Sequence, residues 1–275
     1  RAWARADSAR RVTIAFLDTG IDHSHPEFAG RILPGYDFVG DDDDPADDHG
    51  HGTACAGIAA AEGDNWIGIA GMAWQAEILP VKVLDRHGFG AWHRVAAGVV
   101  YAADRGAELL SMTFGGDGSM LAEAAIAYAW SRGCVMFAPT GNDNREYLIF
   151  PARYPQVAAV GALSPCLERK SPATCDGETW WGSNHGAGTD FMAPGVSVMT
   201  TDIIGPRGYA PGGYYASFNG TSAATAFAVG TAALLLSQLP EISNTQALNR
   251  LRMTCEDLGG RGADGETGYG LLNAD

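Results

Sequence analysis

The segment that most constrains this fold is the run 223–236, which is apolar on nearly every face of the helix it would form. Its sequence is AATAFAVGTAALLL. A helix that is apolar all round is buried inside a large core and does not lie on a surface. The rest of the chain must therefore supply layers that enclose this segment.

The four residues before this helix form a small, tight turn, Asn219-Gly220-Thr221-Ser222. Ser222 would then stand at the N-terminus of a buried helix, where free backbone N–H groups and the positive end of the helix dipole favour negative charge. We interpret Ser222 as a candidate nucleophile. The alternative is that Thr221 or Ser222 only caps the helix.

Length and composition suit one globular domain with a large core, or at most two. The chain has 275 residues, of which 46% are hydrophobic and 18% charged. The run 223–236 is interrupted by Thr and Gly, and no apolar stretch is long enough to predict a membrane span. The start, Arg1-Ala2-Trp3, does not resemble a signal peptide, so we interpret residues 1–275 as a mature or trimmed form.

Charge and cysteine content exclude some classes of protein. The net charge of −14 argues against nucleic-acid binding, which needs a basic face, and is compatible with bound cations. Five cysteines are too few for a disulfide scaffold. Cys166 and Cys175 flank a polar loop and could close a short disulfide, which would indicate an oxidising compartment.

Strands and helices alternate through the first two thirds of the sequence. This pattern predicts an α/β fold: a single-domain, three-layer sandwich whose mostly parallel sheet is covered by helices on both faces. The segment 174–218 is rich in glycine and irregular, and no elements are assigned to it. The predicted strands are 12–17, 78–84, 109–114, 134–138 and 157–163, and the predicted helices are 54–61, 92–105, 120–132 and 223–236.

Polar residues mark the ends of three predicted strands, where sites gather in parallel sheets. These ends are Asp18-Thr19-Gly20, the segment 113–116, and Thr140-Gly141-Asn142. Alone, Asp18 and Asn142 could be turn residues, and His51 could be a metal ligand or a solvated loop residue. Together with Ser222, however, they supply the acid, base and hydroxyl of a nucleophilic acyl-transfer site.

Four motifs, in this order along the chain, resemble the signatures of the subtilisin-like serine proteases. They are Asp18-Thr19-Gly20-Ile21-Asp22, His51-Gly52-Thr53, Thr140-Gly141-Asn142 and Asn219-Gly220-Thr221-Ser222-Ala223. The resemblance extends from about Val12 to Asn273. The loop 35–44 and Cys55 are most similar in pattern to the thermitase and proteinase K branches of the family.

The resemblance implies a role for each motif residue. Ser222 would attack the scissile carbonyl, and His51 would accept its proton and pass it to the leaving amine. Asp18 would hold the His51 tautomer. Asn142 and the backbone N–H of Ser222 would stabilise the oxyanion.

The resemblance also implies how a peptide would be held. Gly88, Phe89 and Gly90 on one side and Thr113, Phe114 and Gly115 on the other would be edge segments between which an extended substrate adds as a strand. Trp92, Val95 and Phe114 would line the pocket for the fourth residue before the cleaved bond; the alternative is that Trp92 and Phe114 are ordinary core or surface aromatics. The walls of the primary pocket would be 113–115 with Thr140, Gly141, Asn142 and Asp143.

Ile149 stands where many relatives have Gly. We predict that it makes the primary pocket shallower, so that Leu, Met or Ala is preferred to Trp before the cleaved bond. Asp143 at the rim could also attract a basic side chain.

Three cation sites are expected from the same resemblance. Their ligands are Asp37, Asp42, Asp44 and the carbonyl of Ala46 for one Ca²⁺; Glu27, Asn65 and the carbonyls of Gly63, Ile67 and Ile69 for a second; and Asp190 with the carbonyls of Ala152, Tyr154 and Val157 for a monovalent cation. Clustered carboxylates suit Ca²⁺ and would otherwise repel one another. The alternative for the first cluster is a solvated acidic loop.

The sequence therefore predicts a secreted, monomeric serine endopeptidase that acts on peptides or proteins, without nucleic-acid or membrane partners. Residues 1–275 would be its mature peptidase domain, with the prosegment absent. A protease or peptide ligase dedicated to one precursor remains an alternative. A catalytically silent binding module is a third reading, against which the complete set of motif residues weighs.

Overall fold

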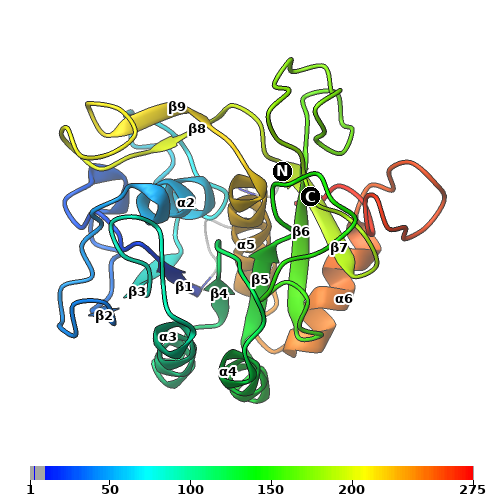
Figure 1. Cartoon of the computed structure of the whole chain (residues 1–275). Coiled ribbons are helices and arrows are strands. Elements are labelled where there is room, and N and C mark those ends of the chain that lie inside the picture. The colour runs from blue at the N-terminus through cyan, green and yellow to red at the C-terminus, as the bar shows by residue number, and fades with distance from the viewer. Residues whose placement is uncertain (1–2, 4–9, 275) are drawn as a thin grey trace.

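The computed structural model describes Trp3 and residues 10–274, and its centre is a seven-stranded parallel sheet (Figure 1). The strand order is β2-β3-β1-β4-β5-β6-β7. The α/β sandwich predicted from the sequence is confirmed. The strands of this sheet are β1 (Thr13–Asp18), β2 (Tyr36–Asp37), β3 (Glu77–Lys82), β4 (Leu109–Ser111), β5 (Val135–Pro139), β6 (Val157–Leu163) and β7 (Thr189–Pro194).

Helices cover both faces of the sheet. One face carries α3 (Trp92–Asp104) and α4 (Met120–Ser131), which lie side by side below the sheet in Figure 1. The other face carries α2 (His51–Ala60), α5 (Thr221–Gln238) and α6 (Asn244–Thr254). A short 3₁₀ turn, η1 (Pro26–Phe28), and an antiparallel hairpin of β8 (Val198–Thr201) and β9 (Tyr214–Phe218) complete the described elements.

Helix α5 is the buried helix that the apolar run predicts. By length and composition it could cross a membrane, but 72% of the relevant window is buried inside the fold. It contacts α2 and strands β4 to β7, and its small residues permit this close approach. At Gly230, for example, an added Cβ would lie only 2.8 Å from the carbonyl oxygen of Ala59.

The structure differs from the sequence-based assignment at several elements, among them α6 and β2, which were not predicted. Strand β4 ends at Ser111, so Thr113 and Phe114 lie beyond the sheet and are free to face the site. The unassigned segment 174–218 contains β7, β8 and β9, which the glycine-rich sequence did not reveal.

The sheet brings the marked strand ends to one edge. Asp18 is the last residue of β1, Thr113 follows β4, and Asn142 follows β5, while β1, β4 and β5 are neighbours in the sheet. Because all three strands run parallel, these residues leave the sheet on the same side.

Candidate active site

A buried carboxylate–imidazole pair lies at the end of β1. Asp18 is completely buried, and His51 Nδ1 lies 2.8 Å from its Oδ1 and 3.0 Å from its Oδ2. The N–H of Thr19 donates to Asp18 Oδ1 at 2.7 Å, and the Thr113 hydroxyl donates to Oδ2. With its proton on Nδ1, the imidazole leaves Nε2 free to accept a proton.

Asp47 fixes the position of His51 at the start of α2. Its Oδ1 accepts hydrogen bonds from the Thr19 hydroxyl and the N–H of Gly50, and its Oδ2 accepts from the N–H and hydroxyl of Thr53. Gly50, which has a φ of 105°, provides the reversal before the helix. Asp47 was not among the predicted site residues; its function here is to satisfy the free N–H groups of a helix N-terminus.

The pair is electrostatically coupled. Burial opposes the ionisation of both groups, but the mutual attraction and the hydrogen bonds to Asp18 outweigh it. The pKa of Asp18 is therefore lowered, and the pKa of His51 is raised well above its usual value by the charge of Asp18. His51 is therefore neutral, and able to accept a proton, mainly at a pH above this raised pKa.

Ser222 is in the first turn of α5 and lies next to the same strand ends. Its hydroxyl donates to the Thr113 carbonyl oxygen at 3.1 Å. Within the described residues no hydrogen bond joins Ser222 to His51. Thr113 thus contacts both Asp18, through its hydroxyl, and Ser222, through its carbonyl. The sequence predicted it as part of a substrate-binding edge segment and as a pocket wall, but not as a link between these two residues.

Asn142 is held so that its amide nitrogen stays available. Its Oδ1 accepts hydrogen bonds from the N–H and the hydroxyl of Thr221, at 2.9 and 2.8 Å. In the part of the chain that the structure describes, neither Asn142 Nδ2 nor the backbone N–H of Ser222 has a hydrogen-bond partner. Both donors lie near one point, 3.5 and 3.7 Å from the position of a Cβ on Gly220, an arrangement suited to binding an oxyanion.

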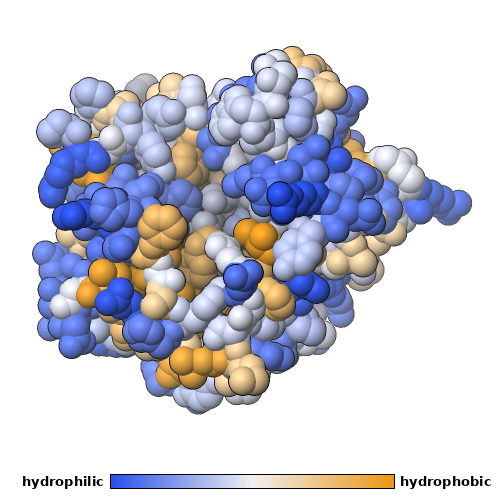
Figure 2. All heavy atoms as spheres, viewed as in Figure 1, coloured by the Kyte–Doolittle hydropathy of each residue, from blue (hydrophilic) through white to orange (hydrophobic). Residues whose placement is uncertain are grey.

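The two segments expected to bind the peptide lie in loops that follow β3 and β4. Gly88, Phe89 and Gly90 form an exposed turn between β3 and α3, and the Phe89 side chain is 75% exposed. The rings of Trp92 and Phe114 pack edge to face with centroids 6.4 Å apart, and both pack against the cluster that contains Val95. Figure 2, viewed as in Figure 1, shows apolar residues gathered near the middle of the visible face of the molecule, with hydrophilic surface to either side.

Ile149 fills the space between two segments assigned as walls of the primary pocket. A Cβ added at Gly115 would lie 2.0 Å from Ile149 Cδ1, and one added at Gly141 would lie 3.3 Å from its Cγ2. The N–H of Ile149 donates to the Thr140 carbonyl at 3.2 Å, which holds the backbone from which this side chain projects.

The acidic loop contains one arrangement that fits a cation. Asp37 and Asp42 pair across the loop, and their Oδ2 atoms both lie 3.0 Å from the position of a Cβ on Gly40. Neither of these oxygens accepts a hydrogen bond within the described residues. Asp44 is exposed, and Ala46 lies beside Ile21 through a β-bridge. Hard oxygens left without donors in one small space suit Ca²⁺.

At the second expected calcium site the Glu27 carboxylate is already hydrogen-bonded. The structure brings Glu27 and the loop 63–69 together, but the Glu27 carboxylate accepts hydrogen bonds from Asn65 Nδ2 at 2.8 Å, from the N–H of Ile69 at 2.9 Å and from the Tyr214 hydroxyl at 3.0 Å. The Asn65 oxygen accepts from the N–H of Ile67. These donors do not favour Glu27 as a ligand, and the site made of Glu27, Gly63, Asn65, Ile67 and Ile69 stays a prediction.

At the expected monovalent-cation site the Asp190 carboxylate is likewise already hydrogen-bonded. Ala152, Tyr154, Val157 and Asp190 do line one cavity, of about 620 Å³. However, the Arg252 guanidinium lies in the same cavity and donates to Asp190 Oδ1 from Nη2 at 2.8 Å and from Nε at 3.2 Å. The Ala159 N–H donates to the other oxygen. The chain's own cation therefore neutralises Asp190.

The cysteines divide into a disulfide and three thiols. Cys166 and Cys175 form a disulfide. Cys55 is buried with its Sγ 3.9 Å from His51 Nδ1, and burial raises its pKa, so it stays a neutral thiol. Burial likewise raises the pKa of Cys134 to about 11 and that of Cys255 to about 12. All three thiols are therefore poor nucleophiles.

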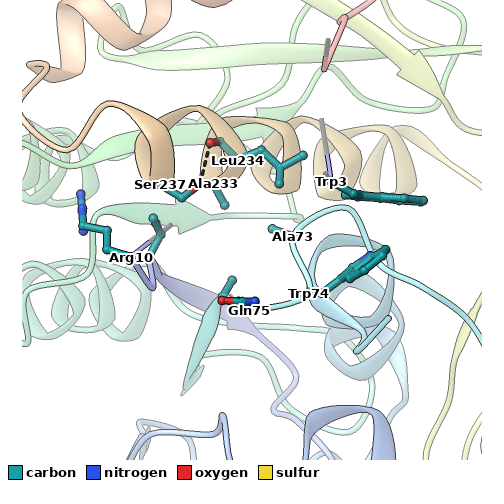
Figure 3. Close-up of a pocket in the computed structure, with 10 residues that line it drawn as sticks. Trp3, Arg10, Ala73, Trp74, Gln75, Ala233, Leu234 and Ser237 are labelled. Atoms are coloured by element: carbon teal, nitrogen blue, oxygen red, sulfur yellow. Dashed lines mark hydrogen bonds between the residues drawn. The ribbon is translucent and has the colours of Figure 1, made fainter. Parts of the chain in front are cut away.

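A second, small apolar pocket is separate from these residues. It holds about 30 Å³ and is lined by residues before β3 and by Ala233, Leu234 and Ser237 of α5 (Figure 3). The Trp3 ring packs against Trp74 with centroids 4.7 Å apart, and its Nε1 donates to the Met72 carbonyl. Eleven residues of helix separate Ser222 from Ala233, about 16 Å along α5, so this pocket belongs to the packing of the N-terminal region.

A parallel α/β sandwich that places an Asp–His pair and a serine at a helix N-terminus beside the same strand end is typical of a class of serine peptidases. Residues 9–270 match the profile of the subtilase family. The chain belongs to this family, and its fold and relatives place it among the subtilisin-like serine endopeptidases.

Two similar proteins and one similar structure support this assignment. The chain is 39% identical to the thermophilic serine proteinase of Bacillus sp. (strain AK1) over 99% of its own length, but spans only 63% of that protein. It is 38% identical to thermitase of Thermoactinomyces vulgaris, over 95% of this chain and 87% of thermitase. The structure of sphericase superposes with a TM-score of 0.83 at 29% identity, covering 98% of this chain and 95% of that one.

Proposed function

We propose that this chain hydrolyses peptide bonds through an acyl-enzyme formed on Ser222. The observation that carries the proposal is the convergence at Thr113: its side chain binds Asp18 of the Asp18–His51 pair, and its carbonyl binds Ser222. The acid and the nucleophile, from distant segments, thus meet at Thr113, and the base His51 is joined to them through Asp18. The complete set argues against a silent binding module.

The residues divide the reaction between them. Ser222 Oγ attacks the carbonyl carbon and its proton passes to His51 Nε2, after the hydroxyl turns from Thr113 toward the imidazole. Asp18 stabilises the imidazolium that forms. Asn142 Nδ2 and the Ser222 N–H donate to the oxyanion, and both are unused donors in the free protein. The imidazolium then protonates the leaving amine. In the second half of the reaction, His51 accepts a proton from a water molecule that attacks the acyl carbonyl, and it returns this proton to Ser222 Oγ as the acid product leaves.

Substrate would be an extended peptide or unfolded protein segment, bound as a strand between residues 88–90 and 113–115. The position of Ile149 supports a shallow primary pocket with a preference for Leu, Met or Ala over Trp. All the groups invoked come from one chain, so a monomer suffices. We propose that residues 1–275 are one peptidase domain that acts outside the cell, because its disulfide needs an oxidising compartment.

Ca²⁺ is proposed at the acidic loop, held by Asp37 and Asp42 with help from Asp44 and the Ala46 carbonyl. The ion would supply the positive charge that this loop lacks and would stabilise the fold without taking part in the chemistry. A protein dedicated to one precursor would share the same triad, and the range of peptides cleaved separates it from a broad endopeptidase.

The catalytic assignment predicts distinct losses for two variants. Ser222→Ala should lower kcat about 10⁶-fold, whereas Asn142→Ala should lower kcat about 10²–10³-fold with little change in KM, the ranges measured for such groups in subtilisin. The measurements are labelling by a fluorophosphonate and hydrolysis of a peptide p-nitroanilide. Labelling of Ser222→Ala at the wild-type rate, or no labelling of the wild type, would contradict the proposal.

The pocket assignment predicts a change of specificity. Ile149→Gly should raise kcat/KM for a peptide with Phe before the cleaved bond, relative to Ala, by roughly 10–200-fold, because it removes the side chain that fills the pocket. Ile149→Val, which keeps most of the volume, is the matched control and should change the ratio much less. An unchanged Phe-to-Ala ratio in Ile149→Gly would show that this side chain does not limit the pocket.

The calcium assignment predicts that the thermal stability depends on free Ca²⁺. At a calcium concentration 100 times the Kd, binding to the folded state alone stabilises it by about 2.7 kcal/mol, so a chelator should lower the Tm. Asp42→Asn should reduce this difference, while Asp43→Asn, a neighbouring acid outside the proposed ligands, should preserve it. Equal Tm values with calcium and with chelator in the wild type would rule the site out.

A further inference from the structure

We propose that Glu178, on the disulfide-closed loop between β6 and β7, is a positioning residue for the turn that carries Ser222. The inference rests on the proposed function and concerns a residue outside the sequence motifs. The loop comprises residues 164–183 and includes the Cys166–Cys175 disulfide.

The Glu178 carboxylate joins this loop to the nucleophile turn. Its Oε1 accepts a hydrogen bond from Asn219 Nδ2 at 2.9 Å, and its Oε2 accepts from Trp181 Nε1 at 2.6 Å. The other end of the Asn219 amide accepts from the N–H of Ser197 at 2.6 Å. Asn219 is three residues before Ser222, so its amide is fixed at both ends directly ahead of the nucleophile.

Contacts of the buried Lys170 hold the base of the loop, and they therefore also hold Glu178 in place. The Lys170 ammonium is completely buried and donates to the carbonyl oxygens of Ser171 and Glu178 at 2.7 and 2.6 Å. It also pairs with Asp176 at 3.0 Å and lies 5.2 Å from the centre of the Trp181 ring. Burial opposes the ionisation of Asp176, but hydrogen bonds from Thr174, the Glu178 N–H and Lys170 lower its pKa to about 2.

The same loop also holds the oxyanion segment. The Gly182 N–H donates to the Asn142 carbonyl at 3.3 Å, and the Asn144 N–H donates to the Gly182 carbonyl at 2.8 Å. Asn184, just after the loop, accepts from the N–H groups of Asp143 and Arg145. One loop thus sets the positions of two reacting parts: the Ser222 turn through Glu178, and Asn142 through Gly182.

The consequence concerns the chemical step and not peptide binding. Displacing the nucleophile or an oxyanion donor by about 1 Å can cost 10²-fold in rate. Glu178 contacts neither the proposed peptide-binding segments nor the triad side chains in the described structure, so its loss should lower kcat and leave KM unchanged. Gln at this position offers one acceptor oxygen for two donors and should preserve part of the support.

The test compares Glu178→Ala, Glu178→Gln and the matched control Glu168→Ala, which removes an exposed carboxylate from the same loop. Each protein is titrated with a fluorophosphonate, and kcat and KM are measured on a peptide p-nitroanilide beside the Tm. We expect kcat about tenfold lower in Glu178→Ala with KM unchanged. Glu178→Gln should lie between Glu178→Ala and the wild type, and Glu168→Ala should equal the wild type.

A double-mutant comparison then locates the effect. Adding Glu178→Ala to Asn219→Ala should cost no further kcat, because the two residues act through one hydrogen bond. A kcat of Glu178→Ala within about twofold of the wild-type value, per titrated site, would overturn the inference. So would a double variant in which the losses of kcat from Glu178→Ala and from Asn219→Ala multiply. Failure of the wild type to react with the fluorophosphonate would instead overturn the proposed function, and the inference with it.

Discussion

The site depends on one buried negative charge. Asp18 is inaccessible to water at the end of a central strand, and a carboxylate in that position is tolerated only if it is paired and hydrogen-bonded. His51, Thr19 and Thr113 provide these partners. The same bonds that stabilise the charge also orient the imidazole and position Thr113, whose carbonyl faces Ser222. Folding and catalytic geometry are therefore satisfied by the same contacts.

Several other carboxylates of this acidic chain have partners within the fold. Asp47 satisfies the N-terminus of α2, Asp48 pairs with the buried Lys82 at 2.6 Å, and Asp190 pairs with Arg252. Glu27 and Glu178 each accept hydrogen bonds from neutral donors. Asp37 and Asp42 differ from these described carboxylates because their Oδ2 atoms, both without a donor, lie close to the same point. This arrangement supports the proposed cation site in the acidic loop.

The sequence predicted the parts whose signals are local. Buried strands appeared as short apolar runs, and helix α5 as an apolar segment after a glycine turn. The motif residues were found because each follows a strand or begins a helix. Helix α6 was missed although Ser243 and Gln246 form a capping box, a signal that the sequence does contain. Segment 174–218 gave no such signal, because its short strands depend on contacts with distant parts of the chain.

The long-range contacts could not be predicted in the same way. Arg252 is 62 residues from Asp190, and nothing near either residue indicates that an arginine takes the place of a cation. Thr113 and Asp18 are 95 residues apart, and Glu178 and Asn219 are 41 apart. In each case nothing about the residue type indicates the distant partner, and only the folded structure brings the two residues together.

The most direct test of this account is the pH dependence of the acylation rate in the wild type and in Asp18→Asn. The wild type should lose activity as pH falls through the raised pKa of His51, because protonated imidazole cannot accept the Ser222 proton. Without the charge of Asp18 the pKa of His51 should fall, so the acid limb should move to lower pH while the maximal rate drops by about 10⁴. An acid limb and a rate that both stay where the wild type has them would contradict the claim that Asp18 controls His51.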